Sequence, residues 1–510
     1  MKHHATQEMS TLGMKFVLPA SWTKAIDSHP LLAALYPLIR QSAIYLVGAG
    51  LIGLGNFAVV PLYARYLRAE QFGLYALIEI ALLMTVTTTQ LGLGTAYVRW
   101  YAETDKGERD GLLGSCTLAV LLAGIAGGML LVILAGPLGA KWFGMLGSLR
   151  WFLFPLVIFR NFQGFFFCVL QASQRATVYV TAAVTRLVLL FATGIWFLAW
   201  RREGVAGILH SWLLADGVCF LLLAALCLRS QRLSFQPKVL KSMLRFGFPL
   251  VWTSFMALLL DASGRFFLAR EHSLTEVAMY VVGIKLTNII SMGFLQPFAN
   301  AWAGIAYPIA QRPNAQLTYT KILGYALVVA MLLVALMILF GPYLVRLFAG
   351  RAYLQVTHLL PWLLLPASFR LLEYWSCMPF HLKYKTHWVS AFYTLGVVIC
   401  AGMNMLLVPR YGALGAAWAW CGALGSIIVL LAVAGRNHYV LPADGKTLGF
   451  AASLWLVSVL SSRTSQSLGG RTGLATSLIC AAVLITACAV YFYSDVRASR
   501  GLFVQGAYAD

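Results

Sequence analysis

The stretch Leu118-Ala-Val-Leu-Leu-Ala-Gly-Ile-Ala-Gly-Gly-Met-Leu-Leu-Val-Ile-Leu-Ala135 contains only apolar residues and glycine. A transmembrane helix needs about 20 mainly apolar residues, whereas a transmembrane β-strand alternates apolar and polar residues over about ten positions. Residues 118–135 show no such alternation. The stretch therefore predicts an α-helix that spans a membrane.

The composition of the whole chain extends this prediction. Of its 510 residues, 60% are hydrophobic and 11% are charged, and the mean hydropathy is +0.78. Soluble domains have about 45–50% apolar and about 25% charged residues. This composition excludes a soluble multidomain enzyme, a disordered chain and a disulfide-stapled secreted module. We predict an all-α polytopic membrane protein.

Apolar runs long enough to span a bilayer recur along the chain. They lie at about residues 44–64, 74–97, 112–136, 151–171, 177–200, 207–228, 247–269, 277–303, 323–345, 358–380, 388–408, 412–434, 447–461 and 473–493. We therefore expect about 14 transmembrane helices, of which the thirteenth is the shortest. The loops between them are short and leave no room for an extramembrane catalytic domain, so we do not expect an enzyme.

The positive charges indicate how the chain is oriented. The net charge is +21, and most of the 38 Lys and Arg residues lie in short loops rather than in a basic domain, so we expect no nucleic-acid partner. Basic residues favour the cytoplasmic side of a membrane protein. The segment with Arg229, Arg232, Lys238, Lys241 and Arg245 is the strongest indicator. The distribution predicts that both termini are cytoplasmic. No cleavable signal peptide is expected, because residues 1–40 lack a long apolar segment with a cleavage site.

Two apparent motifs do not predict chemistry. Residues 48–53 match the G-x-G-x-x-G dinucleotide pattern, but the glycines lie inside an apolar spanning run instead of after a β-strand. Close helix packing explains them better. The nine cysteines all lie in apolar runs without a C-x-x-C pair. We expect neither a cofactor nor a metal site.

The sequence contains an internal repeat at an offset of about 205 to 210 residues. The corresponding positions are Arg40 and Arg245, Asn56 and Asp261, Tyr75 and Tyr280, Arg175 and Lys385, and Gly204-x-x-Gly207-x-x-x-x-Trp212 and Gly412-x-x-Gly415-x-x-x-x-Trp420. Six helices separate the copies, so both halves enter the membrane from the same side. We predict a basic cytoplasmic segment (1–40), two six-helix lobes (41–240 and 241–436) with a cleft between them, and two further helices with a cytoplasmic tail (437–510).

Nine ionisable residues lie inside predicted spans. They are Glu79, Asp216, Asp261, Glu373, Arg160, Arg186, Arg265, Lys285 and Arg370. Such residues cost about 2.5 kcal/mol or more and usually face a partner or an aqueous path. Asp261 with Arg265, and Arg370 with Glu373, have the spacing of pairs on one helix face. Arg160 and Arg186 either contact an anion or line a polar seam with Asp216.

Lys285 has no acidic residue at helical spacing on its own span. A shift of 206 positions along the repeat leads from Lys285 to Glu79. We hypothesise that these two residues face one another across the cleft, pair when the cleft is empty, and separate when an anion binds Lys285.

Several stretches resemble one known family. They are Pro61-Leu-Tyr-Ala-Arg-Tyr-Leu67, Glu70-Gln-Phe-Gly-Leu-Tyr75, Leu244-Arg-Phe-Gly-Phe-Pro249, Asp261-Ala-Ser-Gly-Arg-Phe-Phe267, Glu276-Val-Ala-Met-Tyr280 and Asn404-Met-Leu-Leu-Val-Pro-Arg-Tyr-Gly-Ala-Leu-Gly-Ala416. Residues 38–440 resemble the polysaccharide flippases of bacterial inner membranes, which include O-antigen flippases. These belong to the multidrug/oligosaccharidyl-lipid/polysaccharide exporter superfamily. The family offers no role for residues 1–40.

The resemblance implies a transporter in the bacterial inner membrane, with 12 or 14 helices and two lobes that alternate access. Its expected cargo is a polyprenyl-diphosphate-linked oligosaccharide or exopolysaccharide precursor, moved to the periplasmic leaflet. Lys285 resembles the cation that meets the anionic head group in such flippases. The implied partners are the lipid-linked glycan and membrane lipids, with polysaccharide polymerase or export machinery left open.

The charged residues are consistent with that class of substrate, because a diphosphate cannot cross about 30 Å of hydrocarbon unaided. We predict that Lys285, Arg265, Arg160 and Arg186 bind the substrate. Glu79, Asp261 and Asp216 are the predicted ion-coupling carboxylates, because no nucleotide motif is visible and an ion gradient must then supply the energy.

Three other functions stay open. A multidrug or cation antiporter of the same superfamily would need net acid in the cleft. Once the two local pairs are set aside, three basic residues (Arg160, Arg186, Lys285) face two acidic ones (Glu79, Asp216). A membrane glycan polymerase or ligase would need a large outside loop, and a scaffold protein would have no need of buried charges.

Overall fold

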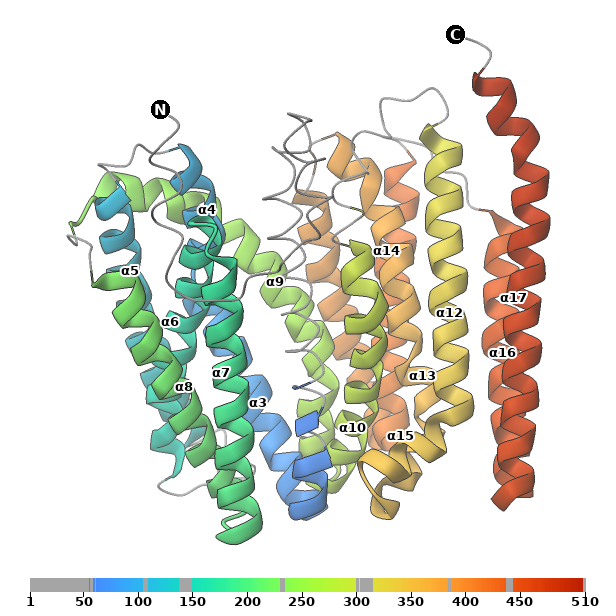
Figure 1. The fold of residues 1–510 in the computed structure, drawn as a ribbon, viewed down its shortest axis with the longest axis horizontal. Helices are drawn as coiled ribbons and strands as arrows, with labels where there is room; N and C mark the ends of the chain where they lie inside the picture. Colours follow the sequence, from blue (N-terminus) through green and yellow to red (C-terminus); the bar gives the residue numbers. More distant parts are fainter. Residues whose placement is uncertain are drawn as a thin grey trace, which may run out of the picture.

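Figure 1 shows the protein as a computed structural model that consists of long helices. The structure describes residues 55, 58–59, 61–103, 109–136, 149–229, 234–299, 302, 315–383, 385, 387–436 and 444–507. No β-strand occurs among these residues. The all-helical fold class is therefore confirmed, while the predicted segment 1–40 lies outside the described residues.

The helices follow the apolar runs of the sequence. The first group is α3 (Ala69–Thr89), α4 (Leu93–Glu103), α5 (Arg109–Ala135), α6 (Leu153–Ala172), α7 (Ala176–Ile195) with the π-turn Trp196–Trp200, and α8 (Val205–Leu228). The next elements are α9 (Pro237–Glu271), α10 (Leu274–Ile290) with the π-turn Ser291–Leu295, α12 (Ala315–Phe348), the 3₁₀ segment Arg351–His358, α13 (Leu360–Leu363) and α14 (Leu365–Leu382). The last are α15 (His387–Gly435), α16 (Gly445–Leu468) and α17 (Gly470–Ala507).

Ten helices of the described residues are long and apolar enough to cross a membrane. One of them, α15, contains two of the predicted spans, because the backbone leaves the helical conformation at Gly412. The predicted runs 358–380 and 447–461 fall on α14 and α16, which are helices but are not among the ten. The run 44–64 lies largely outside the described residues. The chain is a multi-pass membrane protein, and the count of 14 spans stays a prediction.

The expectation of one continuous helix over residues 74–97 is wrong. Helix α3 ends at Thr89 and α4 begins at Leu93, with Leu91 at φ 53° and Gly92 at φ 67° between them. A methyl group at Gly92 would lie 2.5 Å from the carbonyl oxygen of Gly247 in α9, so only glycine allows this approach. The hydropathy pattern runs through the break because Gln90 is the only polar residue between Thr89 and Leu93.

Helix α9 passes between two groups of helices, α3 to α8 and α10 to α17 (Figure 1). Its first part packs with α4 and α5, and buried Met243 belongs to the same apolar cluster as Leu112 and Phe166. Its later part packs with α3, α10 and α15 in a second cluster that includes Leu260 and Ala416. Helix α9 and the direct packing of α3 on α10 therefore both join the two groups.

The backbone conformation supports the internal repeat. Gly204 has φ 61° and ψ −132°, and Gly412 has φ 53° and ψ −131°, so the two repeat positions share one left-handed conformation. The carboxylate of Glu276 accepts a hydrogen bond from the Ala413 N–H (3.0 Å) at the second of these glycines. The partners of two other repeat pairs, Arg40 and Asn56, lie outside the described residues.

Candidate functional site

A cavity of about 860 Å³ lies between the two groups of helices. Helices α3, α6, α7 and α8 contribute one side of its lining, and α9, α10 and α12 contribute the other. Its charged lining residues are Glu79, Arg160, Arg186, Arg265 and Lys285. Four basic side chains thus face the cavity with one acidic side chain, and all four predicted substrate-binding residues come together there.

Glu79 and Lys285 form an ion pair across the interface between α3 and α10. The ammonium Nζ of Lys285 lies 2.9 Å from each carboxylate oxygen of Glu79. The hydroxyl of Tyr75, one turn earlier in α3, donates a hydrogen bond to Glu79 Oε1 (2.9 Å). The predicted pairing of these two residues is confirmed. Whether the pair opens when an anion binds stays a prediction.

Arg160 and Arg186 share one carboxylate. Their Nε atoms donate to the two oxygens of Asp216 at 2.7 and 2.6 Å, and the Asp216 side chain is fully buried. The side-chain amide of Gln163 donates to the Asp216 carbonyl oxygen (2.6 Å), and the Arg160 guanidinium lies 4.3 Å from the centre of the Trp212 ring. The predicted polar seam with Asp216 is therefore present, and both arginines also line the cavity. Their contact with an anion stays a prediction.

The predicted local pair of Asp261 with Arg265 is wrong. Asp261 instead accepts from Arg370 Nη2 (3.2 Å to each oxygen) and from Trp420 Nε1 (3.0 Å), because it faces α14 and α15. Arg265 is 8% exposed, lines the cavity, and among the described residues has no acceptor for its Nε. The cavity therefore has one more uncompensated cation than the sequence indicated.

The predicted pair of Arg370 with Glu373 is confirmed at 3.0 Å. The hydroxyl of Tyr393 donates to Glu373 as well. Two carboxylates, Asp261 and Glu373, thus surround one guanidinium in a cluster that lies apart from the cavity lining. This cluster holds one more carboxylate than guanidinium groups.

Two features of the site were missed in the sequence. Arg160 and Arg370 are 210 positions apart, the same offset as Arg175 and Lys385, so the repeat places an arginine beside a carboxylate in each half. The offset was visible and could have revealed this correspondence. Trp212 was recognised only as a repeat residue, although it also lines the cavity under Arg160.

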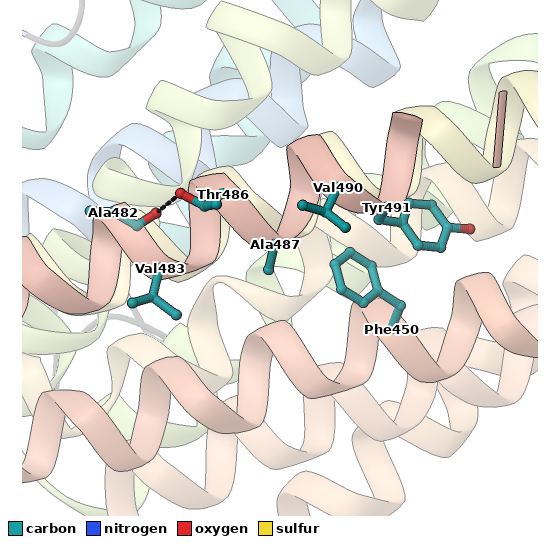
Figure 2. A pocket seen from close by; sticks show the side chains of 7 residues that line it. All are labelled: Phe450, Ala482, Val483, Thr486, Ala487, Val490 and Tyr491. Atoms are coloured by element: carbon teal, nitrogen blue, oxygen red, sulfur yellow. Dashed lines mark hydrogen bonds between the residues drawn. The ribbon is translucent and has the colours of Figure 1, made fainter. Parts of the chain in front are cut away.

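A second hollow lies at the surface between α16 and α17. It has a volume of about 670 Å³, and Figure 2 shows its seven lining residues, among them the stacked rings of Phe450 and Tyr491. None of the seven carries a charge, so this groove has nothing with which to bind a charged head group. The described residues also include no group of three His, Cys, Asp or Glu side chains that could hold a metal ion.

The chain has the fold of the transporters of the multidrug/oligosaccharidyl-lipid/polysaccharide (MOP) exporter superfamily. A structure of the lipid II flippase MurJ in an inward closed conformation matches with a TM-score of 0.69 and 13% identity, covering 90% of this chain and 99% of that one. An inward-facing multidrug resistance MATE transporter matches with a TM-score of 0.56 and 17% identity, covering 79% and 95%. At these identities the likeness shows the fold alone.

Residues 39–303 match the family described as polysaccharide biosynthesis protein, and the chain belongs to that family. A MOP-superfamily transporter from Pyrococcus furiosus, described as having a binding pocket of reverse polarity, also matches the structure with a TM-score of 0.50 and 16% identity, covering 82% of this chain and 96% of that one. No curated protein sequence matches this chain. The resemblance predicted from the sequence is thus confirmed for the family and the fold.

Proposed function

We propose that the protein is a flippase that moves a polyprenyl-diphosphate-linked oligosaccharide or exopolysaccharide precursor from the cytoplasmic to the periplasmic leaflet. One observation carries this proposal. The central cavity is lined by four basic residues and one acidic residue, and the buried Arg265 has no carboxylate partner among the described residues. The family described as polysaccharide biosynthesis protein supports the same class of substrate.

The free energy of the buried charges favours an anionic ligand. A buried guanidinium without a partner is costly, because its lost hydration is not replaced by hydrogen bonds. A diphosphate offers several acceptor oxygens and two or more negative charges, and its hydrogen bonds to Arg and Lys are charge-assisted. The prenyl chain can stay in the lipid while the polar head group crosses. No covalent bond changes in this process.

The carboxylate of Glu79 and the phosphate of the substrate compete for the same cation, Lys285. A phosphate that binds Lys285 displaces the Glu79 carboxylate, which lies 2.9 Å from the ammonium. The released carboxylate can then take up a proton. We propose this exchange as the step that couples the transport to a proton gradient. The cluster of Asp261 and Glu373 around Arg370 is a second place that can hold a proton, since it has one surplus carboxylate.

Asp216 is better suited to a positioning role than to the coupling role predicted from the sequence. It is fully buried and bound by two guanidinium groups at 2.7 and 2.6 Å. Protonation of Asp216 would leave both guanidinium groups without a counter-charge. We propose that it holds Arg160 and Arg186 in place, while their terminal amino groups, which have no acceptor among the described residues, face the substrate.

The function can be tested by a leaflet-exposure assay on the purified protein in vesicles. A fluorescent prenyl-diphosphate sugar is placed in one leaflet, and a membrane-impermeant quencher reports its arrival in the other. We expect the wild type to move this probe, and Lys285→Ala to slow it by at least tenfold, because the cation that competes for the phosphate is lost. Arg463→Ala, at an exposed position outside the cavity, is the control and should move it at the wild-type rate.

Two results would contradict the proposal. One is a wild type that leaves the prenyl-diphosphate sugar in place but moves a cationic dye, which would favour the multidrug antiporter. The other is a Lys285→Ala protein that moves the diphosphate probe at the wild-type rate.

A further inference from the structure

The first part of α9 has one face that is fixed to the rest of the protein. The N–H of Gln236 donates to the hydroxyl of Ser115 (2.7 Å), and the sulfur of Met243 lies 3.7 Å from the thiol of Cys116. Gly247 packs against the backbone of Leu91 and Gly92. The opposite face of the helix is exposed at Lys238, Lys241, Arg245 and Phe248, and one turn further on the indole N–H of Trp252 donates to the Thr394 hydroxyl (3.2 Å) while its ring stays partly exposed.

The opposite face carries cations followed by aromatic rings. Lys238, Lys241, Arg245, Phe248 and Trp252 are spaced by three or four residues, so they form a single stripe along the helix. The three basic residues are exposed, and Phe248 and Trp252 are 65% and 44% exposed. None of the three basic residues forms an ion pair with a described residue, and no acidic residue occurs in the sequence from 217 to 260.

We propose that this α9 stripe binds an anionic phospholipid of the bilayer, of the phosphatidylglycerol class. The phosphate would lie on Lys238, Lys241 and Arg245, and an acyl chain would lie along Phe248 and Trp252. Basic side chains next to a membrane span attract anionic lipids with about 1 kcal/mol each, and aromatic rings favour the interface below the head groups. The stripe lies at the end of α9 that the charge distribution places on the cytoplasmic side.

The order of the residues along the stripe points to a lipid and not to a soluble anion. A soluble phosphate would be satisfied by the three cations and would gain nothing from the exposed rings of Phe248 and Trp252. A phospholipid matches both parts, because its charged and apolar ends lie in the same order along the membrane normal. The stripe also lies outside the lining of the central cavity, so it does not depend on the proposed transport function.

The proposal can be tested with the purified full-length protein in detergent. Native mass spectrometry would count the phosphatidylglycerol and phosphatidylcholine molecules that the protein retains. The test variant is the triple substitution Lys238→Ala, Lys241→Ala and Arg245→Ala. The matched control is Arg410→Ala, Arg463→Ala and Arg471→Ala, which removes the same charge from exposed positions elsewhere.

We expect the wild type to retain phosphatidylglycerol over phosphatidylcholine. Each cation removed from the α9 stripe should weaken retention about fivefold, and the control triple variant should behave like the wild type. Equal loss in the two triple variants would overturn the proposal, as would equal retention of the two lipids by the wild type.

Two further measurements use the wild type alone, so they test the proposal even if the triple variant does not fold. One varies the ionic strength, and the other adds a competing ligand. Retention of phosphatidylglycerol should fall as ionic strength rises, because the interaction is electrostatic, and salt-independent retention would overturn the proposal. Farnesyl diphosphate should leave the bound phosphatidylglycerol in place. Its displacement by farnesyl diphosphate would assign the α9 stripe to the prenyl-diphosphate substrate instead.

Discussion

Replacement of Arg265 by glutamine is expected to abolish most of the transport while the protein keeps its stability. Arg265 lines the cavity, is 8% exposed and lacks an acceptor for its Nε among the described residues. Its removal leaves no carboxylate without a partner, because Asp261 is bound to Arg370 and Trp420. The loss of one buried charge contact to the substrate costs about 2–5 kcal/mol, so the flipping rate at low substrate should fall at least thirtyfold.

Arg370→Gln provides the matched control for Arg265→Gln. Both positions are arginines in the same half of the molecule, but Arg370 holds Asp261 and Glu373. Its removal leaves two carboxylates without a counter-charge, so the melting temperature of the purified protein should drop clearly. The account is contradicted if Arg265→Gln melts as low as Arg370→Gln, or if Arg265→Gln transports the probe normally.

Replacement of Asp216 by asparagine is expected to give the largest loss of stability among the cavity variants. The substitution leaves Arg160 and Arg186 facing each other without the carboxylate that now lies 2.7 and 2.6 Å from them. Removal of one member of a buried ion cluster typically costs about 3–5 kcal/mol. We expect a lower melting temperature and weaker binding of farnesyl diphosphate to the purified protein.

Two companion variants separate a positioning role from a general packing defect. Asp216→Glu keeps the charge and should recover part of the farnesyl diphosphate affinity. The double variant Asp216→Asn with Arg186→Gln removes one of the two opposed cations and should melt higher than Asp216→Asn alone. Asp216→Asn with normal stability and normal farnesyl diphosphate affinity would disprove the positioning role.

The residues that could be predicted from the sequence were those tied to the repeat or to composition. Continuous hydropathy predicts the spanning helices, since no soluble surface could carry such runs. The offset of 206 residues predicts the contact of Glu79 with Lys285, and the structure places their charged atoms 2.9 Å apart. A duplicated fold brings equivalent positions to equivalent places around a common axis, so a shift along the sequence gives a contact in space.

The residues that could not be predicted depend on which neighbouring helix a side chain faces. Asp261 and Arg265 have the spacing of a pair on one helix, but spacing alone does not exclude a stronger partner on α14. The break at Leu91 and Gly92 was hidden for a similar reason. It depends on the close approach of Gly247 from a distant helix, which hydropathy does not record.

The most direct test of the central claim is to map where a prenyl-diphosphate ligand binds. A photoreactive prenyl diphosphate, with its reactive group next to the phosphates, is bound to the purified protein and cross-linked, and the labelled peptides are identified by mass spectrometry. We predict labels on cavity residues such as Tyr63, Trp212 and Asn288, with competition by unlabelled diphosphate and loss in Arg265→Gln. Labels confined to the apolar groove of α16 and α17, or labels that unlabelled diphosphate does not reduce, would contradict the account.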